Sequence, residues 1–182
     1  MQSDFDGLSK LNTLLQRDIK SELFAICAVQ NYINFKLTPQ ETEKLRLQWQ
    51  NIVMDQSKKG KRIKYVQVCK VPLTETMLNY LRFGLKPLDR FGELHLAIDF
   101  DTFTRIATDW DINKEYWLID YDRLVELQFT KEGAWLGFKE SRDPKLIKEI
   151  ARIKKRCLSK AVSIDNFLIK HGDDEKLVSP QS

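Results

Sequence analysis

The sequence has few of the residues that most often carry catalysis. Its 182 residues include two histidines, His95 and His171, and seven glycines. No serine lies in a nucleophile elbow, and no glycine-rich loop is present that could hold a phosphate. The spacing of the histidines assigns no acid–base pair and no metal cluster, so we interpret both as surface or strand residues. These absences favour a binding protein over an enzyme, and we expect no cofactor.

Cysteines and long apolar runs are also scarce. Cys27, Cys69 and Cys157 are widely separated and show no CxxC spacing, so we interpret them as small buried residues in a reducing compartment. The first residues, MQSDFDG, are acidic and lack the apolar stretch of a signal peptide. The longest apolar run, Leu23 to Val29, is too short to cross a bilayer. We therefore expect a cytoplasmic protein without a membrane partner.

Length and composition are typical of one soluble domain. The chain is 42% hydrophobic and 31% charged, and a chain of this size buries roughly 70% of its unfolded surface. We expect a single α+β domain over residues 21–171. An amphipathic helix in residues 1–20 precedes it, and a disordered tail in residues 172–182 follows it.

Start signals indicate three main helices. Thr38–Glu41 combines an N-cap threonine, a proline at the first helical position and a capping-box glutamate, and Gly60 should end that helix. Thr74 begins a second helix, which we expect to end at Gly84. Asp143-Pro144 begins a third, long helix with an apolar stripe.

Strand patterns follow from β-branched and aromatic residues. Ile63 to Lys70 predicts a central strand, and Leu94 to Ile98 alternates apolar and other residues. Tyr116 to Ile119 and Leu124 to Phe129 predict a hairpin with a tight turn near Tyr121-Asp122.

One further strand, Ala134 to Phe138, follows the hairpin. Leu23 to Val29 fits either a buried strand or the end of the first helix, and the β-favouring residues Tyr32 to Lys36 that follow favour the strand. Together these segments predict a mixed sheet of about five or six strands packed by the three main helices.

Charge is distributed unevenly around a net value of +4. Residues 58–64 hold five cations and no acid, and residues 145–160 hold seven cations against one acid. A solvated helix face would explain the second cluster, but both clusters together would bind phosphates or acidic groups. We therefore predict a non-enzymatic module that binds a protein or nucleic-acid partner through Lys59, Lys61, Arg62, Lys148, Arg152 and Lys155.

Acidic residues are concentrated in residues 99–122, in three Asp-x-Asp pairs. In an extended chain each pair shares one face and could chelate a hard cation. An alternative function is therefore a Mg²⁺-dependent nuclease or phosphodiesterase that uses Asp99, Asp101, Asp120 and Glu126. Turn formation by the aspartates, or an acidic partner-binding face, explains the same pattern. A third possible function is a homo-oligomeric scaffold that associates through residues 8–19.

Several segments resemble a bacterial family of unknown function, whose members are small proteins often encoded beside helix-turn-helix regulators. The segments that carry the resemblance are Gly60 to Val68, Pro72-Leu73, Gly92-Glu93, Trp117 to Asp120, the Gly133 turn and Asp143-Pro144 with its helix. The resemblance covers about two thirds of the chain, and the family has no assigned reaction. We expect the predicted binding module to act in regulation or defence.

The order of elements also resembles the half-domain of the phospholipase D fold. That superfamily needs a histidine nucleophile, a lysine two residues later and an aspartate five residues beyond. If Asp120 is placed on this aspartate, Asn113 takes the histidine position and Glu115 the lysine position. An amide cannot attack phosphorus and an acid repels phosphate, so the resemblance implies the fold without the reaction.

Overall fold

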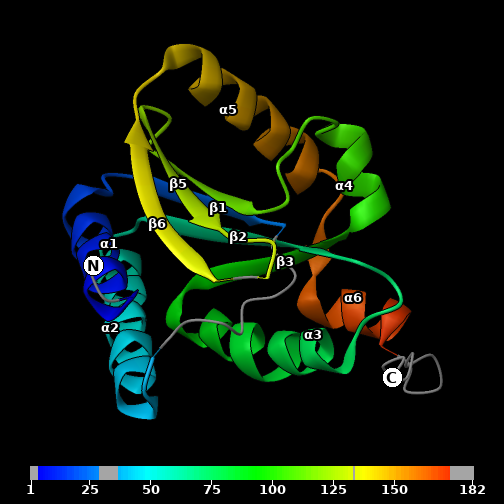
Figure 1. The fold of residues 1–182 in the computed structure, drawn as a ribbon, viewed down its shortest axis with the longest axis horizontal. Coiled ribbons are helices and arrows are strands. Elements are labelled where there is room, and N and C mark those ends of the chain that lie inside the picture. Colours follow the sequence, from blue (N-terminus) through cyan, green and yellow to red (C-terminus); the bar gives the residue numbers. More distant parts are fainter. Residues whose placement is uncertain (1–3, 29–36, 133, 173–182) are drawn as a thin grey trace.

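The computed structural model describes residues 4–28, 37–132 and 134–172. It shows one α+β domain built on a seven-stranded mixed sheet with helices on both faces (Figure 1). The expected fold class is therefore confirmed, with one or two more strands than expected. The segments expected to be β-favouring at 32–36 and disordered at 173–182 lie outside the described residues.

The N-terminal elements follow the sequence patterns closely. Helix α1 (Asp4–Asp18) is followed by strand β1 (Glu22–Cys27), so the ambiguous apolar run forms a strand. Every residue of β1 is buried. A strand that is covered on both faces carries no alternation of apolar and polar residues, which is why periodicity alone left this segment undecided.

Helix α2 (Pro39–Lys58) begins with the predicted capping box. The Thr38 side chain accepts a hydrogen bond from the Glu41 N–H at 3.2 Å, and the Glu41 carboxylate accepts one from the Thr38 N–H at 2.7 Å. These backbone and side-chain donors on Thr38 lower the pKa of Glu41. Gly60 follows the helix with a φ of 73°, as expected for a residue just past a helix end.

The helix that begins after Thr74 is longer and less regular than predicted. Helix α3 (Glu75–Asn79) continues into a π-helical segment, η2 (Tyr80–Leu85), and a 3₁₀ segment, η3 (Lys86–Phe91). The prediction that Gly84 ends the helix is wrong, because Gly84 lies inside the π-helical segment. The break comes at Gly92, which has a φ of 99°.

Strands β2 (Arg62–Cys69) and β3 (Glu93–Asp99) flank this helical segment, and helix α4 (Phe100–Ile106) follows directly. Strands β4 (Lys114–Ile119) and β5 (Arg123–Phe129) form the predicted hairpin. Its turn is centred on Asp120 and Tyr121, which have φ angles of 50° and 61°. Two consecutive positive φ angles are typical of a type I′ turn.

The C-terminal elements complete both edges of the sheet and cover part of its faces. Strand β6 (Trp135–Ser141) completes the meander, and helix α5 (Pro144–Leu158) is capped by Asp143 as predicted. The two-residue strand β7 (Val162–Ser163) and helix α6 (Ile164–His171) end the described chain. β7 pairs with the edge of β3, and this short pairing was not predicted from the sequence.

The strand order is β6-β5-β4-β1-β2-β3-β7. β1, β2 and β3 are parallel, and all other pairings are antiparallel. The meander of β4, β5 and β6 therefore joins the parallel strands at β1, which lies at the centre of the sheet.

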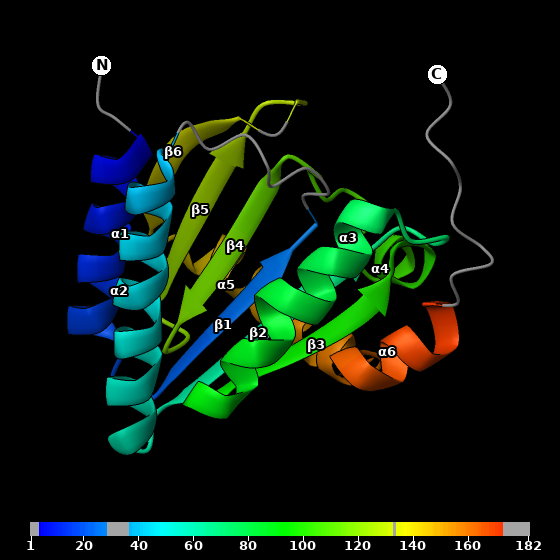
Figure 2. The same ribbon diagram turned by 90° about the horizontal axis from the view of Figure 1, so that it is seen from below.

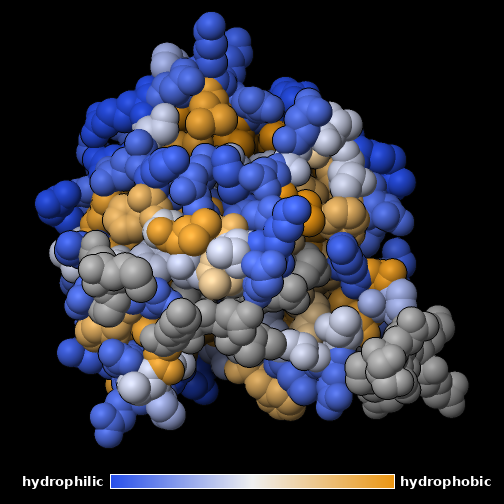
Figure 3. Space-filling view, viewed as in Figure 1, coloured by the Kyte–Doolittle hydropathy of each residue, from blue (hydrophilic) through white to orange (hydrophobic). Residues whose placement is uncertain are grey.

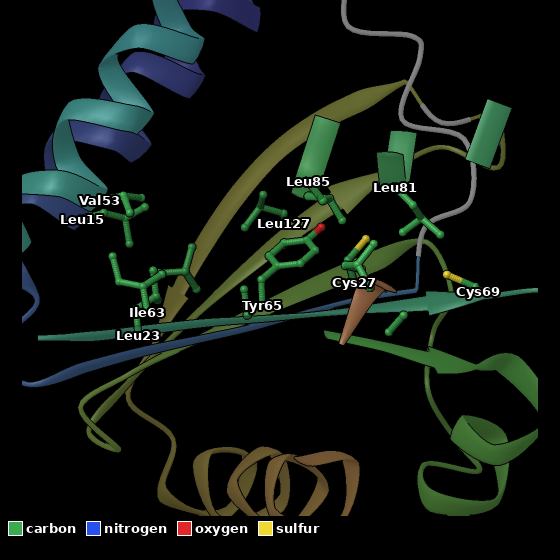
Figure 4. Close-up of a cluster of buried hydrophobic side chains, with 14 of the residues drawn as sticks. Leu15, Leu23, Cys27, Val53, Ile63, Tyr65, Cys69, Leu81, Leu85 and Leu127 are labelled. Carbon is green, nitrogen blue, oxygen red and sulfur yellow. The ribbon is translucent and has the colours of Figure 1, made fainter. Parts of the chain in front are cut away.

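Two apolar cores lie on opposite faces of this sheet. One, on the side of α4 and α5, contains Phe24, Ile26, Val66 and Ile98 from the strands. The other lies under α1, α2, α3 and α6, with α2 and α3 standing apart over the sheet (Figure 2). In this second core Tyr65 extends from β2 into the space between the Leu15 and Leu85 groups (Figure 4).

The Asp120 carboxylate connects the β4–β5 turn to the start of β1. It accepts hydrogen bonds from the backbone N–H groups of Lys20, Ser21 and Glu22 at 2.7 to 2.8 Å, and from the Ser21 hydroxyl at 2.7 Å. Burial raises the pKa of Asp120, but these donors together lower it more, so the pKa lies below its ordinary value. The negative charge is therefore part of the native structure.

We expect Asp120→Ala to lower the free energy of unfolding by about 2–4 kcal/mol, because three backbone donors lose a charged acceptor. Denaturant unfolding would measure the loss. The matched control is Asp122→Ala, since Asp122 is exposed in the same turn. Because the pKa of Asp120 is depressed in the folded state, its contribution is present above about pH 4 and disappears on further acidification. Equal stability of the two variants at neutral pH would contradict this role.

Candidate functional site

A cavity of about 500 Å³ lies over the sheet, between α1, α2 and the π-helical segment. Its walls come from apolar residues of these helices, which include Leu11, Leu45 and Leu85. Its floor comes from the strands. Among cavities of this size, those with a few converging polar groups are the usual places for small ligands.

Strand register brings the floor residues together from distant parts of the sequence. His95, Tyr65, Ala25 and Trp117 occupy one row across β3, β2, β1 and β4. Side chains in one row point to the same face of a sheet. Ala25 has only a methyl group at the middle of this row, between Tyr65 and Trp117, and this small side chain leaves space above β1.

Two buried carboxylates flank the row. Glu93 is 3% exposed and Glu115 is 2% exposed. Trp49 of α2 donates its indole N–H to Glu93 at 3.0 Å, and Trp117 donates its own to Glu115. The two indole rings lie against each other with centroids 5.5 Å apart. Each tryptophan therefore orients one acid, and the pair of rings lies between them.

His95 is part of this polar group rather than a surface residue. Its side chain is 1% exposed; its Nδ1 lies 2.8 Å from Asp89 and its Nε2 lies 3.4 Å from Glu93. Burial lowers the pKa of His95, but the contacts with Glu93 and Asp89 outweigh it and hold the pKa above its ordinary value. His95 lies in a strand, as expected, but it is buried and is not a surface residue.

Further polar groups lie beside the cavity. Gln67 is fully buried and donates its amide to the Val68 carbonyl at 3.0 Å. Tyr80 extends from the π-helical segment, and burial raises the pKa of its hydroxyl well above the ordinary value. The face of the sheet under α1 and α2 thus carries several polar side chains that form hydrogen bonds.

The predicted basic residues are divided between two sides of the molecule. Lys148, Arg152 and Lys155 are exposed on α5, where hydrophilic side chains surround the helix at the top of the view (Figure 3). Lys59 lies at the end of α2, on the other face, and binds Asp55 at 2.6 Å. The Lys61 ammonium donates to the Ile19 carbonyl near α1.

Arg62 is close to the α5 side. Its guanidinium lies 3.8 Å from Glu22, and the buried Lys154 of α5 lies 2.9 Å from the same carboxylate. Lys154 also donates to the Tyr121 hydroxyl at 2.6 Å. The structure therefore brings Arg62 and α5 together but directs Lys59 and Lys61 elsewhere.

The acidic residues of the alternative metal site are also separated. Asp99 and Asp101 line a hollow of about 620 Å³ with Lys70 and Lys170, beyond the end of β3. Asp120 lies at the other end of the parallel strands, where its carboxylate binds the start of β1.

Glu126, the fourth acid, lies on β5 and contacts Lys114 at 3.2 Å. Asp99 serves as the N-cap of α4, since its carboxylate accepts the Thr102 N–H at 2.8 Å. Within the described residues, no group of three or more histidine, cysteine, aspartate or glutamate side chains could hold a metal ion.

The apolar face of residues 8–19 packs inside the molecule. Leu11, Leu15 and Ile19 are at most 2% exposed and belong to the core under α1 and α2. Association of copies through this face would have to remove it from that core, so the scaffold proposal has no support from this helix. The three cysteines are buried and unbridged, in agreement with their interpretation.

Two sequence signals could have revealed the cavity. Glu93 and His95 alternate with leucines in β3. Glu115 and Trp117 are two residues apart in β4 and therefore lie on the same face of that strand. Leu94, by contrast, is 46% exposed. If the leucines of β3 are assumed to point inward, Glu93 and His95 are placed on the exposed face. Only the pairing of the strands shows that Glu93 and His95 face the helices.

Comparison with known proteins agrees with the expected family type and fold. The model of a family described as Domain of unknown function (DUF6879) matches residues 28–169. No curated protein matches the chain. The solved structure of NucT from Helicobacter pylori is similar, with a TM-score of 0.54 and 10% identity over 88% of this chain and 92% of NucT.

The fold of NucT is phospholipase D-like, so the resemblance in fold is confirmed. At this level of identity the similarity shows the fold alone. The expected gene neighbourhood beside helix-turn-helix regulators stays a prediction. In the described parts of the chain, no helix is both long and apolar enough to cross a membrane.

We expect His95→Gln to remove a pH-dependent part of the stability. A raised folded-state pKa means that protonated His95 stabilises the fold fully below about pH 6.5, and that this contribution is lost as pH rises through the folded pKa. The difference in unfolding free energy between wild type and His95→Gln should therefore shrink as pH rises above about 6.5. His171→Gln controls for the loss of an imidazole. Parallel stability curves for wild type and His95→Gln would contradict the charged pairing.

Proposed function

This chain belongs to the family described as Domain of unknown function (DUF6879), and we propose that it is a non-catalytic module that binds nucleic acid through α5. The proposed surface consists of Lys148, Arg152 and Lys155, extended by Arg62 at the start of β2. Exposed lysine and arginine on one helix bind phosphates with little dependence on sequence.

The observation that supports this proposal is how the exposed cations of α5 are paired with acids. Among the described residues, Lys148, Arg152 and Lys155 form no ion pair with an acidic side chain. Glu149 is the one acid among residues 145–160. Glu149 is exposed beside Lys148, and Glu22, which is buried beneath α5, pairs with Lys154 and lies near Arg62. The exposed surface of α5 therefore carries more cations than acids.

A lack of catalysis follows from the residues at the positions of the phospholipase D pattern. The fold is shared, but Asn113 and Glu115 stand where that pattern has histidine and lysine. Glu115 is buried and accepts a hydrogen bond from Trp117, so it provides neither a nucleophile nor a positive charge for phosphate. A binding role in regulation or defence, in the cytoplasm, is consistent with three buried cysteines that form no disulfide.

We expect the triple variant Lys148→Glu, Arg152→Glu, Lys155→Glu to abolish binding of a labelled DNA or RNA oligonucleotide, because three phosphate contacts become repulsive. Fluorescence anisotropy at two salt concentrations would measure it, and wild-type affinity should fall with salt. The matched control reverses Lys10, Lys131 and Lys139, which are exposed on other elements. Equal loss in both variants would show only a net-charge effect and would overturn the α5 surface.

Lys59→Glu, Lys61→Glu and Arg62→Glu test the second predicted cluster. Because Lys59 and Lys61 are held by Asp55 and by the Ile19 carbonyl, we expect this variant to weaken binding less than the α5 variant. If no nucleic acid binds but an acidic polypeptide such as polyglutamate does, the partner is a protein.

A metal-dependent nuclease or phosphodiesterase is the alternative function. It is supported by the fold similarity and by the hollow in which Asp99 and Asp101 lie with Lys70 and Lys170. Carboxylates with a nearby lysine are the groups that metal-assisted phosphate cleavage uses. Against it, Asp120 is engaged in holding β1 and Glu126 lies on another strand.

For the binding module we expect no cleavage of labelled DNA or RNA with Mg²⁺ or Mn²⁺. The informative variant is Asp101→Asn, because Asp101 is exposed and its replacement should leave the melting temperature unchanged. Cleavage that requires the metal and is lost in Asp101→Asn would establish the alternative. Cleavage that persists in this variant would indicate a contaminating nuclease.

A further inference from the structure

We infer that the cavity over β1 binds a small organic cation, a protonated amine or a quaternary ammonium group with an apolar body. This site lies under α1 and α2, on the opposite face of the sheet from α5. It is therefore independent of the proposed nucleic-acid surface, and either proposal can fail without the other.

The charge of the cavity comes from Glu93 and Glu115. Both are buried, and each accepts an indole N–H. A carboxylate in a poorly solvated cavity attracts a cation more strongly than one at the surface. These groups lie on opposite sides of the row that contains Ala25, so a ligand seated over Ala25 would lie between them.

The aromatic side chains suit the same ligand. Trp49 and Trp117 direct their N–H edges to the acids and lie ring against ring, and Tyr65 stands beside them on the floor. Aromatic rings attract cations at their faces, and tryptophan does so best. Aromatic rings together with carboxylates therefore suit an ammonium group that is only weakly hydrated in water.

Among the described residues that line the cavity, the basic side chains are Arg46 and His95. Arg46 is 48% exposed and its guanidinium binds Glu43 on the outer side of α2, at 2.7 Å. His95 is held between Glu93 and Asp89, so its charge is matched within that group. Glu115 lies on the other side of the floor, on β4, with β1 and β2 between it and β3. The end of the cavity near Glu115 and Trp117 is thus where we place the ammonium group.

The apolar walls define the rest of the ligand. Leu11, Leu45, Leu85 and Leu127 line the cavity, so the body attached to the ammonium group should be apolar. A volume of about 500 Å³ accommodates a small molecule rather than a peptide chain. Phosphate and other anions would be repelled by both acids.

The test titrates the full chain with choline, tetramethylammonium and butylammonium chlorides, using tryptophan fluorescence and calorimetry. The key comparison is the neutral analogue of choline in which carbon replaces the quaternary nitrogen. We expect saturable binding of at least one cation and none of the neutral analogue. Preference for choline or for butylammonium distinguishes a quaternary from a protonated amine ligand.

Glu115→Gln preserves shape and removes the charge, and we expect it to weaken cation binding about tenfold or more. Glu126→Gln is the matched control, since Glu126 contacts Lys114 outside the cavity. Ala25→Val should fill the floor and also abolish binding, with circular dichroism and melting temperature reporting whether each variant folds. The α5 triple variant should bind the cation normally.

No binding of any of these cations up to about 10 mM would overturn the inference, because weaker binding would lack specificity. Equal binding of the neutral analogue would overturn it too, since shape rather than charge would then decide. Both comparisons use the wild-type protein, so they remain decisive if a variant does not fold.

Discussion

The contact between the Asp120 carboxylate and the first residues of β1 determines the arrangement on which the rest of the structure depends. Asp120 ends the strand that pairs with β1, and it binds the three N–H groups where β1 begins. It therefore fixes the register between the parallel strands and the antiparallel meander. A shift by one residue would turn every side chain of β1 to the other face. Ala25 would then leave the row that forms the cavity floor.

Both faces of the sheet bury charged side chains. On the α4 and α5 side, Phe24, Ile26 and Val66 form an apolar core, and beside it Glu22 pairs with the buried Lys154 of α5. On the other side, buried acids and a histidine are retained, each with a hydrogen-bond or ion-pair partner. Burying a carboxylate without a partner costs several kcal/mol, on the order of the stability of the whole domain. The partners of these buried groups therefore offset the cost of their burial.

A phospholipase D-like fold here coexists with residues that do not support its reaction. Fold similarity at 10% identity shows a shared path of the backbone but does not show which side chains occupy the site. Glu115 illustrates this, because it occupies the lysine position of the pattern and yet is buried beside Trp117. Of the three positions of that pattern, Glu115 lines the cavity, whereas the Asp120 carboxylate binds the start of β1.

The sequence by itself determined the local structure: the caps at Thr38 and Asp143, the hairpin after Tyr116 and the α+β class all follow from contacts between near neighbours. The irregular helix past Gly84 and the strand β7 could not be predicted, because packing and edge pairing decide them. The cavity depended on tertiary structure alone. Glu93, Glu115 and Trp49 are separated by long stretches of sequence, and only strand register and the position of α2 bring them together. Likewise, charge clusters near residues 60 and 150 were visible in the sequence, but the packing of α5 on the sheet decided that Arg62 joins α5 while Lys59 does not.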